Sequence, residues 1–313
     1  MVNTRGCRAA LKIMSVENIV ICTRARMPSP AQWQQAIRAA GFTLRIDGAF
    51  DTLAFSGHLP CRDGAAVCGF EYFCDNLDQD WLQDLNVDLP AAYDCVVCLA
   101  TRASYDDSAA SCIAAGVLAS MTGGVLLEGG EAPLIAATNA IAWAQRAVRE
   151  LRELKRRDEE AEALATRLAQ DPKQATTAFS QALGALAGQC IDQLVTLDGS
   201  PLLGVRFGNG MAVRGKRWQL DTPDAGSIVS PPPGRRGLRK DEEVTAAAKY
   251  LAQRLTGVAV SYAQLAPEHG LTLWFANGAR LRLHQGEALQ AWELRTAQLR
   301  FEFIEQQLQI TAA

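Results

Sequence analysis

The sequence of 313 residues contains nine cysteines, whose thiols can bind metals or form disulfides. Six of them lie between Cys61 and Cys112, and Cys95-Val-Val-Cys98 has the spacing of a metal or redox pair. On a strand, however, positions 95 and 98 point to opposite faces, and a tetrahedral zinc site needs four converging ligands. The pattern favours buried, apolar thiols over a metal or redox site, and it predicts no cofactor.

Histidine chemistry is limited to His58, His269 and His284. A serine or cysteine nucleophile normally needs a histidine partner, and we expect these three to be surface residues, with His58 in a loop. The sequence has no Gly-x-Ser-x-Gly, phosphate-binding loop or metalloprotease helix motif. We therefore predict that the protein is not an enzyme. An enzyme with an atypical carboxylate site remains the alternative.

Carboxylates gather in residues 75–88, beside a tryptophan. A calcium-binding loop starting at Asp75 would need glycine and glutamate where Asp80 and Asn86 stand, so that motif fails. A solvated acidic face and a docking surface for a basic protein both remain possible. If it is a docking surface, the predicted partner-binding residues are Asp75, Asp78, Asp80, Trp81, Asp84, Asp106 and Asp107.

A basic cluster occurs in the segment after residue 225. Arg235, Arg236, Arg239 and Lys240 could contact phosphate, but no stacking aromatic residues or recognised fold accompany them. The sequence therefore does not predict a nucleic-acid-binding protein. We expect residues 225–240, which include three consecutive prolines, to form an exposed loop.

Length and charge distribution indicate more than one domain. Residues 15–131 carry 6 basic and 15 acidic side chains, a net charge of −9, whereas the whole chain has −3. The first 14 residues lack the apolar core and cleavage site of a signal peptide. They are expected to be a disordered tail, or an extension ahead of a later translation start at Met14. With no segment apolar enough to span a bilayer, the sequence predicts a cytoplasmic protein that does not bind membranes.

Residues 15–131 are expected to form an α+β domain, a mainly antiparallel sheet with two helices on one face. The first helix is predicted over residues 30–40, with Ser29 as N-cap and Gly41 past its end. The second is capped by Asp107 or Ser108 and ended by Gly123. Strands are predicted at 18–23, 42–46, 52–55, 66–73, 94–100 and 125–127, and a short helix within 75–88.

A long connector helix is predicted within residues 132–172, beginning at Pro133. An apolar stripe from Val148 to Leu168 could assemble a homodimer. A solvated helix with ion pairs between neighbouring turns is the alternative. Asp171-Pro172 is expected to end this helix.

Residues 173–313 contain an internal repeat. Leu203, Val205 and Phe207 alternate before Asn209-Gly210, and the same pattern recurs 68 residues later around Asn277-Gly278. Alternation indicates strands, and Asn-Gly between two of them is a strong hairpin signal. Trp218 and Trp292 follow the two hairpins. We therefore predict a duplicated domain of two α-β-β-β units related by a pseudo-twofold axis, with helices at 177–186 and 241–255.

Several short segments resemble uncharacterised bacterial proteins that are grouped with toxin-immunity genes. In the first half these are Met27-Pro28-Ser29-Pro30-Ala-Gln-Trp33, Gly57-His58-Leu59-Pro60, Gly69-Phe70-Glu71-Tyr72 and Met121-Thr122-Gly123-Gly124-Val125; near the end they are Phe275-x-Asn277-Gly278 and Ala291-Trp292-Glu293-Leu294. The resemblance implies a cytoplasmic protein that binds and neutralises a cognate, basic toxin domain. The alternatives are an enzyme that reverses a toxin modification and a regulatory oligomer assembled through the connector helix.

Overall fold

The structure is a computed structural model that divides into two compact units, residues 1–156 and 157–313. It describes residues 16–78, 89–101, 104–129, 131–196, 203–215, 217–224, 226–229, 249–266, 270–284, 292–304 and 307–313. The tail predicted over residues 1–14 lies outside these ranges. Each unit is described by itself below.

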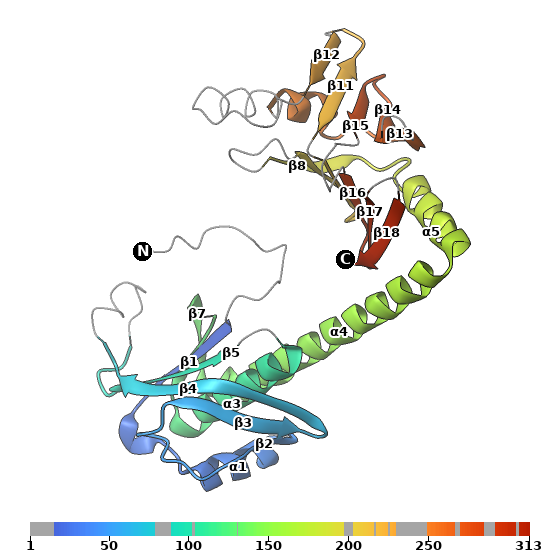
Figure 1. Ribbon diagram of the computed structural model, residues 1–313. Coiled ribbons are helices and arrows are strands. Elements are labelled where there is room, and N and C mark those ends of the chain that lie inside the picture. The colour runs from blue at the N-terminus through green and yellow to red at the C-terminus, as the bar shows by residue number, and fades with distance from the viewer. Residues whose placement is uncertain are drawn as a thin grey trace. The chain divides into compact units, whose positions relative to one another are not determined.

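Unit 1 is built on one seven-stranded antiparallel sheet with strand order β2-β3-β4-β5-β1-β6-β7 (Figure 1). Its elements, in chain order, are β1 (Val16–Cys22), the 3-10 helix η1 (Arg24–Arg26), α1 (Pro30–Ala39), β2 (Leu44–Ile46), β3 (Gly57–Asp63), β4 (Ala66–Asn76), β5 (Cys95–Thr101), α3 (Tyr105–Thr122), β6 (Val125–Glu128), β7 (Glu131–Ala136) and the first part of α4 (Ala137–Gln170).

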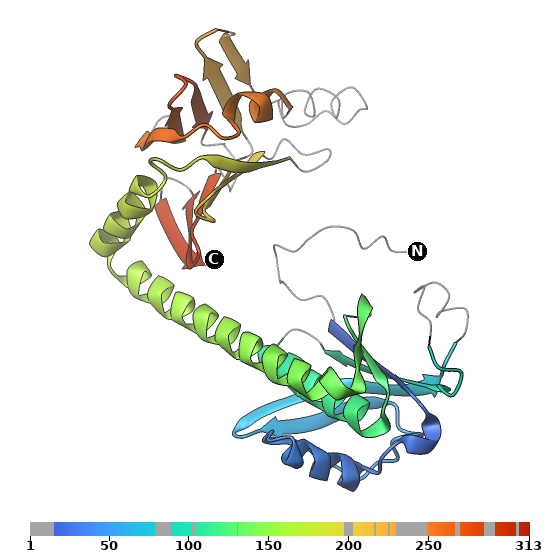
Figure 2. The same ribbon diagram turned by 180° about the vertical axis from the view of Figure 1, so that it is seen from behind.

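Helices α1 and α3 cover one face of this sheet, as predicted, and bury a single apolar core against it. Trp33 and Ile37 of α1 enter that core, and the Trp33 indole donates to the Ala114 carbonyl of α3 over 3.2 Å. The start of α4 runs beside α3 (Figure 2). A β-carbon on Gly116 of α3 would lie 2.7 Å from the Ala140 carbonyl oxygen, so only glycine allows this approach.

The ends of both helices follow local rules. Ser29 caps α1 by a capping box with Gln32, and Gly41 follows with a φ of 84°, as the sequence predicted. Gly123 ends α3 in the left-handed conformation, also as predicted. The predicted cap of α3 was wrong, because Ser104 occupies the N-cap position and accepts from the Asp107 N–H.

Two strands of unit 1 differ from the sequence prediction. Residues 52–54 form a turn rather than a strand, and the strand is β3, which contains His58 and Pro60. Pro60 is tolerated because it stands just past the last paired residue of β2, where its carbonyl accepts from the Asp47 N–H. Residues 131–136 form the edge strand β7, so the connector helix begins at residue 137 and not at Pro133.

Helix α4 contributes to the cores of both units. Val148 lies in the apolar core of unit 1, whereas Ala165 and Leu168 lie in that of unit 2. Leu154, between them, is 36% exposed. The two ends of the predicted dimerisation stripe are therefore buried within the chain itself. The helix ends at Gln170, as predicted, and Asp171 caps the next helix.

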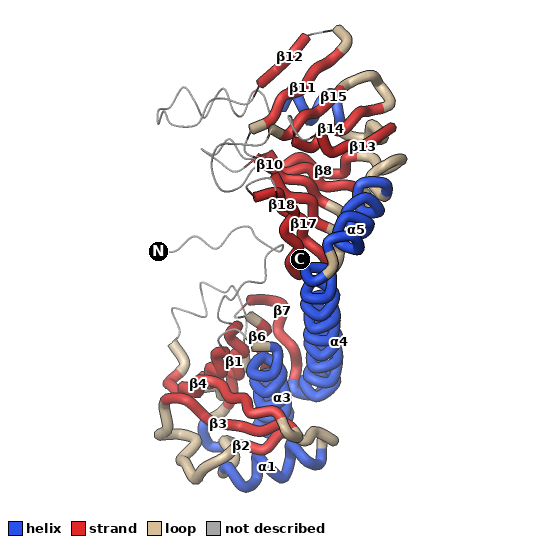
Figure 3. The backbone as a smooth tube through the Cα atoms, turned by 45° about the vertical axis from the view of Figure 1, so that its right-hand side comes forward, coloured by secondary structure: helices blue, strands red, loops and turns tan. Residues whose placement is uncertain are grey.

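Unit 2 contains a six-stranded sheet of order β18-β17-β16-β10-β9-β8 and a five-stranded sheet of order β12-β11-β15-β14-β13 (Figure 3). Its elements are the last part of α4, α5 (Pro172–Gly184), β8 (Ile191–Thr196), β9 (Leu203–Phe207), β10 (Ala212–Gly215), β11 (Trp218–Thr222), β12 (Gly226–Val229), a helical stretch at 249–255, β13 (Val260–Ala266), β14 (Gly270–Phe275), β15 (Arg280–Leu283), β16 (Trp292–Arg295), β17 (Leu299–Ile304) and β18 (Gln307–Ala312).

The two predicted hairpins have the same structure. In each, the asparagine side chain accepts from the N–H two residues later over 3.1 Å, and the glycine has a φ of 81°. Asn209 donates to a carbonyl at the end of the preceding helical segment, and Asn277 does the same. The hairpin strands are β9–β10 and β14–β15. The repeat is therefore structural as well as sequential.

Each repeat has four strands after its helix rather than the predicted three, and its fourth strand pairs with the hairpin of the other repeat. Strand β11 follows β10 in the chain but pairs with β15, and β16 follows β15 but pairs with β10. Reciprocal backbone bonds accompany this exchange, from Gly188 N–H to the Val260 carbonyl and from Gly257 N–H to the Ile191 carbonyl. Each sheet is completed by a strand of the other repeat. The strand β12 falls within the loop expected at 225–240.

The inner faces of the two sheets form one apolar core with α5. Trp292 is 4% exposed, and its ring lies 6.0 Å from that of Phe179 of α5. The outer faces are polar. On one of them Asp221 accepts hydrogen bonds from Ser227, Gln219, Arg280 and Arg282.

Trp292→Ala should lower the free energy of unfolding by about 3–5 kcal/mol, because it leaves a large cavity in the core of unit 2. Trp274→Ala is the matched control: Trp274 is half-buried on an outer face and contacts mainly Tyr262, so its cost should be about 1 kcal/mol. Denaturant unfolding followed by circular dichroism measures both. Equal costs for the two variants would contradict the assignment of inner and outer faces.

Asp221→Asn should reduce the acid sensitivity of unit 2. Burial by itself would raise the pKa of Asp221, but the donors Ser227, Arg282, Gln219 and Arg280 hold this pKa well below its usual value. A lowered pKa stabilises the folded state above about pH 4, and that stability is lost as the pH falls further. The variant should therefore lose about 1.5–3 kcal/mol at pH 7 and show a flatter decline below pH 4.

The control for this measurement is Asp224→Asn, whose carboxylate is exposed and forms an ion pair with Arg254 at 2.6 Å. It should change the unfolding curves less at every pH. Parallel pH dependences for wild-type protein and Asp221→Asn would show that the Asp221 network does not contribute.

Candidate protein-binding surface

The structure describes four of the seven predicted partner-binding residues. Asp75 is exposed in β4, and Asp78 is exposed just after that strand. Asp80, Trp81 and Asp84, and the short helix expected around them, lie outside the described residues. Asp75 therefore belongs to a strand and not to the predicted helix.

Strand β4 presents a second set of side chains to the face that α1 and α3 leave open. Tyr72 and Cys74 point into the helix-covered core, so Glu71, Phe73 and Asp75 face the other way. The Phe73 side chain is 38% exposed between the two carboxylates. The sequence analysis missed Phe73 and Glu71, although the alternation of β4 contains the signal for both.

Register across the sheet places acidic residues around an apolar centre. Glu71 of β4 and Glu17 of β1 both pair with Ala100 of β5, so the three lie in one row. The next row toward the other end of the sheet is Phe73, Cys98 and Ile19, and the third is Asp75, Val96 and Ile21. Ile19 and Ile21 are buried, so Phe73 is the large exposed apolar side chain of these rows, with carboxylates at both ends. This combination suits a partner with both basic and apolar groups.

A smaller apolar cluster forms the floor of this face. Ile19, Ile21 and Leu127 are buried in it, and Leu77, Tyr93 and Leu134 pack against them. Because Leu77 belongs to the cluster, its neighbour Asp78 lies beside the same face. We call the set Glu17, Glu71, Phe73, Asp75 and Asp78 the open-face patch.

The end of the sheet beside the patch is fixed by polar contacts. The backbone N–H of Arg24 donates to the Asp94 carboxylate over 2.6 Å, and the Arg24 guanidinium donates to Asn76 at the end of β4 over 2.9 Å. The Leu77 N–H donates to the Asp94 carbonyl over 3.1 Å. These bonds hold the chain after β4 against the start of β5, and so position Asp75 and Asp78.

Asp106 and Asp107 do not join this patch. Both lie at the start of α3, on the helix-covered side of the sheet. Asp106 forms an ion pair with Lys155 of α4 at 2.8 Å, and Asp107 accepts from the Gly69 N–H at 2.8 Å. That N–H lies beyond the end of the pairing between β4 and β5. The two carboxylates therefore have structural partners, which the sequence pattern could not show.

Cysteines 95 and 98 point to opposite faces of the sheet, as predicted. Cys95 lies in the helix-side core, and Cys98 packs against the open-face cluster. Burial raises the pKa of Cys98 to about 11 and that of Cys112 to about 12, so both thiols stay protonated near neutral pH. Within the described residues, no three His, Cys, Asp or Glu side chains are placed to hold a metal ion.

The remaining candidate residues are scattered. His58 is on β3 rather than in a loop, and its imidazole lies 3.6 Å from the Glu71 carboxylate. His284 is half-buried after β15. His269 and the basic cluster at 235–240 fall outside the described residues. The part of the chain that the structure describes therefore brings no histidine together with a cysteine or serine nucleophile.

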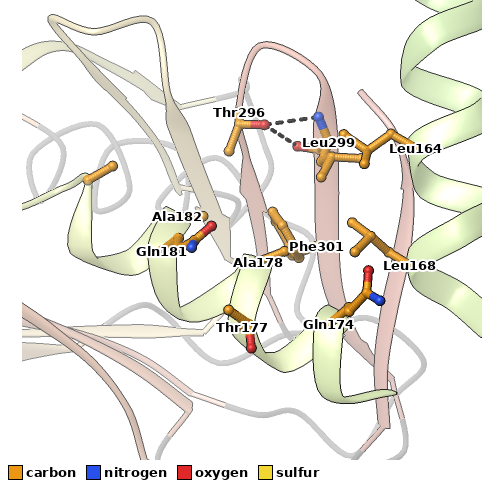
Figure 4. Close-up of a pocket in the computed structure, with 11 residues that line it drawn as sticks. Leu164, Leu168, Gln174, Thr177, Ala178, Gln181, Ala182, Thr296, Leu299 and Phe301 are labelled. Carbon is orange, nitrogen blue, oxygen red and sulfur yellow. Dashed lines mark hydrogen bonds between the residues drawn. The ribbon is translucent and has the colours of Figure 1, made fainter. Parts of the chain in front are cut away.

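An apolar groove of about 550 Å³ opens in unit 2 between the end of α4, α5 and β17 (Figure 4). Leu164 and Leu168 form one wall, and Leu299 and Phe301 form its base. Thr296 does not offer its hydroxyl freely to a ligand, because it both accepts from the Leu299 N–H and donates to the Leu299 carbonyl. The groove can accommodate apolar groups, but it has no charged lining residue.

Comparison of the chain with protein-family models and with curated protein sequences finds no match in either case. No helix in the described ranges combines the length and the apolar character that crossing a membrane requires. The open-face patch lies on the face of a sheet and not in a cleft.

Thiol reactivity of the folded protein tests the described burial. The sequence favoured buried thiols, and this is wrong for Cys190, which is exposed beside β8. Cys190 should be alkylated rapidly by iodoacetamide at neutral pH, whereas the buried Cys61 and Cys112 should react only in denaturant. Peptide mass mapping over time measures each site. Rapid labelling of Cys112 in folded protein would contradict its position in the core.

Proposed function

We propose that this protein binds a basic protein toxin domain and neutralises it by covering its surface, with the open-face patch as the docking site. The observation that carries this proposal is Phe73, an exposed aromatic residue flanked on its own strand by Glu71 and Asp75. An exposed aromatic residue surrounded by side chains of one charge sign is typical of surfaces that bind proteins of the opposite charge. The resemblance of short segments to bacterial immunity proteins points to the same class.

The charge distribution supports the direction of this proposal. Residues 15–131 have a net charge of −9, and the patch takes four carboxylates from that excess. The electrostatic field of these carboxylates raises the association rate with a basic partner. Burial of Phe73 in the complex would lower the dissociation rate. The protein would act in the cytoplasm, where reduced thiols are the normal state.

The patch residues stand mainly on paired strands, and this favours a rigid surface that covers a site on the partner over one that rearranges around it. Glu17, Glu71, Phe73 and Asp75 all stand on paired strands. A preformed surface loses little conformational entropy on binding, and this favours a complex that covers a site on the partner without rearrangement of the sheet.

The test measures binding to a basic protein toxin domain, taken from any toxin-like reading frame that adjoins the gene. In the variant Glu71→Gln/Asp75→Asn/Asp78→Asn the association rate should fall about tenfold at low salt and converge with wild type when salt shortens the Debye length. The control Glu150→Gln/Glu162→Gln/Asp192→Asn removes the same charge from exposed positions elsewhere and should bind at the wild-type rate.

Phe73→Ala should instead accelerate dissociation about 30-fold, as expected for a central anchor worth about 2 kcal/mol. Stopped-flow association and surface-based dissociation measurements separate the two effects, and co-expression with the toxin scores protection. Unchanged rates and full protection in both patch variants, with folding intact by circular dichroism, would exclude this surface.

A further inference from the structure

Three thiols meet on the helix-covered side of unit 1, at the end of the sheet. Cys22 of β1 pairs directly with Cys95 of β5, and Cys74 of β4 is offset diagonally from Cys95, because Cys74 pairs with Val97. The Cys74 and Cys95 sulfurs are 3.5 Å apart. A disulfide needs about 2 Å, so the sulfurs must move closer, and the diagonal offset requires a shift of the two strands as well as of the side chains.

The three thiols interact as a chain rather than as separate core residues. Cys95 is hydrogen-bonded to Cys22 and to Cys74. The hydrogen bond with Cys95 lowers the pKa of Cys22, whereas the hydrogen bond with Cys22 is the main cause that raises the pKa of Cys95 to about 11. The three thiols therefore titrate as one coupled group, in which the proton of one sulfur can pass to another during a reaction.

Access from solvent distinguishes Cys74 from its two neighbours. Cys74 is half-buried, whereas Cys22 and Cys95 are buried. The hydrogen bond with Cys95, together with burial, raises the pKa of Cys74 well above its usual value, and the Arg24 guanidinium, bound to Asn76 two residues later, opposes that rise. One accessible thiol beside one protected thiol is the arrangement in which oxidation of the first leads to a disulfide with the second.

A second cysteine pair in the same sheet provides a comparison. Cys61 and Cys68 face each other across β3 and β4. Both are buried, however, and the Cys61 thiol donates to the Leu59 carbonyl over 3.5 Å. Burial raises the pKa of Cys68 to about 11, and the nearby Asp107 carboxylate adds to that effect. This pair lacks both the solvent access and the cationic neighbour found at Cys74.

We propose that Cys74 and Cys95 are a site of reversible oxidation by hydrogen peroxide, forming a disulfide between β4 and β5. The Cys74 sulfur attacks one peroxide oxygen, the O–O bond breaks, and one water leaves as a sulfenic acid forms. The Cys95 sulfur then attacks the Cys74 sulfur, the S–O bond breaks, and a second water leaves. The two thiols lose two electrons and two protons in total, and one peroxide becomes two waters. A dithiol reductant reverses the reaction.

This cross-link would join the two ends of residues 75–94, which include Asp75 and Asp78 of the open-face patch. The oxidation itself does not depend on the proposed function, because it needs no partner. The proposed disulfide would lie directly beside Asp75, at the two ends of residues 75–94.

The experiment treats reduced, folded Cys7→Ser/Cys190→Ser protein with hydrogen peroxide and measures intact mass and tryptic peptides. We expect the loss of two hydrogens, a peptide pair joined through Cys74 and Cys95, and full reversal by dithiothreitol. The background substitutions remove one exposed cysteine and the cysteine at position 7, which would otherwise cross-link between molecules.

Further substitutions in this background locate the reaction. Cys74→Ser should abolish the cross-link, and Cys98→Ser and Cys61→Ser should retain it. Cys74→Ser is the main test because its side chain is only half-buried, and thermal melts check that each variant folds. A cross-link that persists in Cys74→Ser, that maps to Cys61–Cys68 or Cys22–Cys95, or that is absent from folded protein would overturn the proposal.

Discussion

Close packing of α3 against one face of the seven-stranded sheet determines what unit 1 can offer to a partner. The buried side of α3 combines many small residues with Ile113, Val117 and Leu118, and Gly116 allows the start of α4 to lie against it. Side chains that alternate along β4 are therefore divided between a dry interior and a free surface. Cys74 is on the inside, and its neighbours Phe73 and Asp75 are on the outside. The cluster of three cysteines and the open-face patch therefore lie on opposite faces of the same strands.

In unit 2, the equivalent constraint is the exchange of fourth strands between the repeats. One repeat alone would leave one face and one edge of its sheet uncovered. Exchange of β11 and β16 gives each hairpin a paired edge, and the combined inner faces bury Trp218 and Trp292 together. Side chains on the outer faces are free to be polar, which explains the arginine and carboxylate networks around Asp221 and Glu293.

The parts of the fold that could be predicted are those specified by local chemistry. Ser29 and Gln32 define a helix start, and the two Asn-Gly turns define hairpins, because each depends on neighbouring residues only. Strand β3 was missed because Gly57 and Pro60 are ordinary loop residues, and their place in a strand depends on where β2 ends. Strand exchange could not be predicted either, because pairing within one repeat and pairing between the two repeats fit the same alternation of apolar residues.

The candidate surface was predictable only in part. Asp75 was found from charge, but its neighbours Glu71 and Phe73 become a surface only when the helices cover the opposite side of β4. Asp106 and Asp107 are part of the same excess of acidic residues, but Asp106 pairs with Lys155 and Asp107 accepts from the Gly69 N–H. Their partners are distant in sequence and unrelated to any motif. The contact between Cys74 and Cys95 likewise follows from strand register, which composition does not encode.

Strand exchange also has a consequence for synthesis on the ribosome. Strand β10 pairs with β16, so its second edge has no partner until residue 295 has left the exit tunnel, and β11 similarly waits for β15. The first repeat is thus translated well before it can bury its leucines. Unit 2 must complete its fold at the end of translation or after it. While its sheets are incomplete, the nascent chain would need the protection of chaperones.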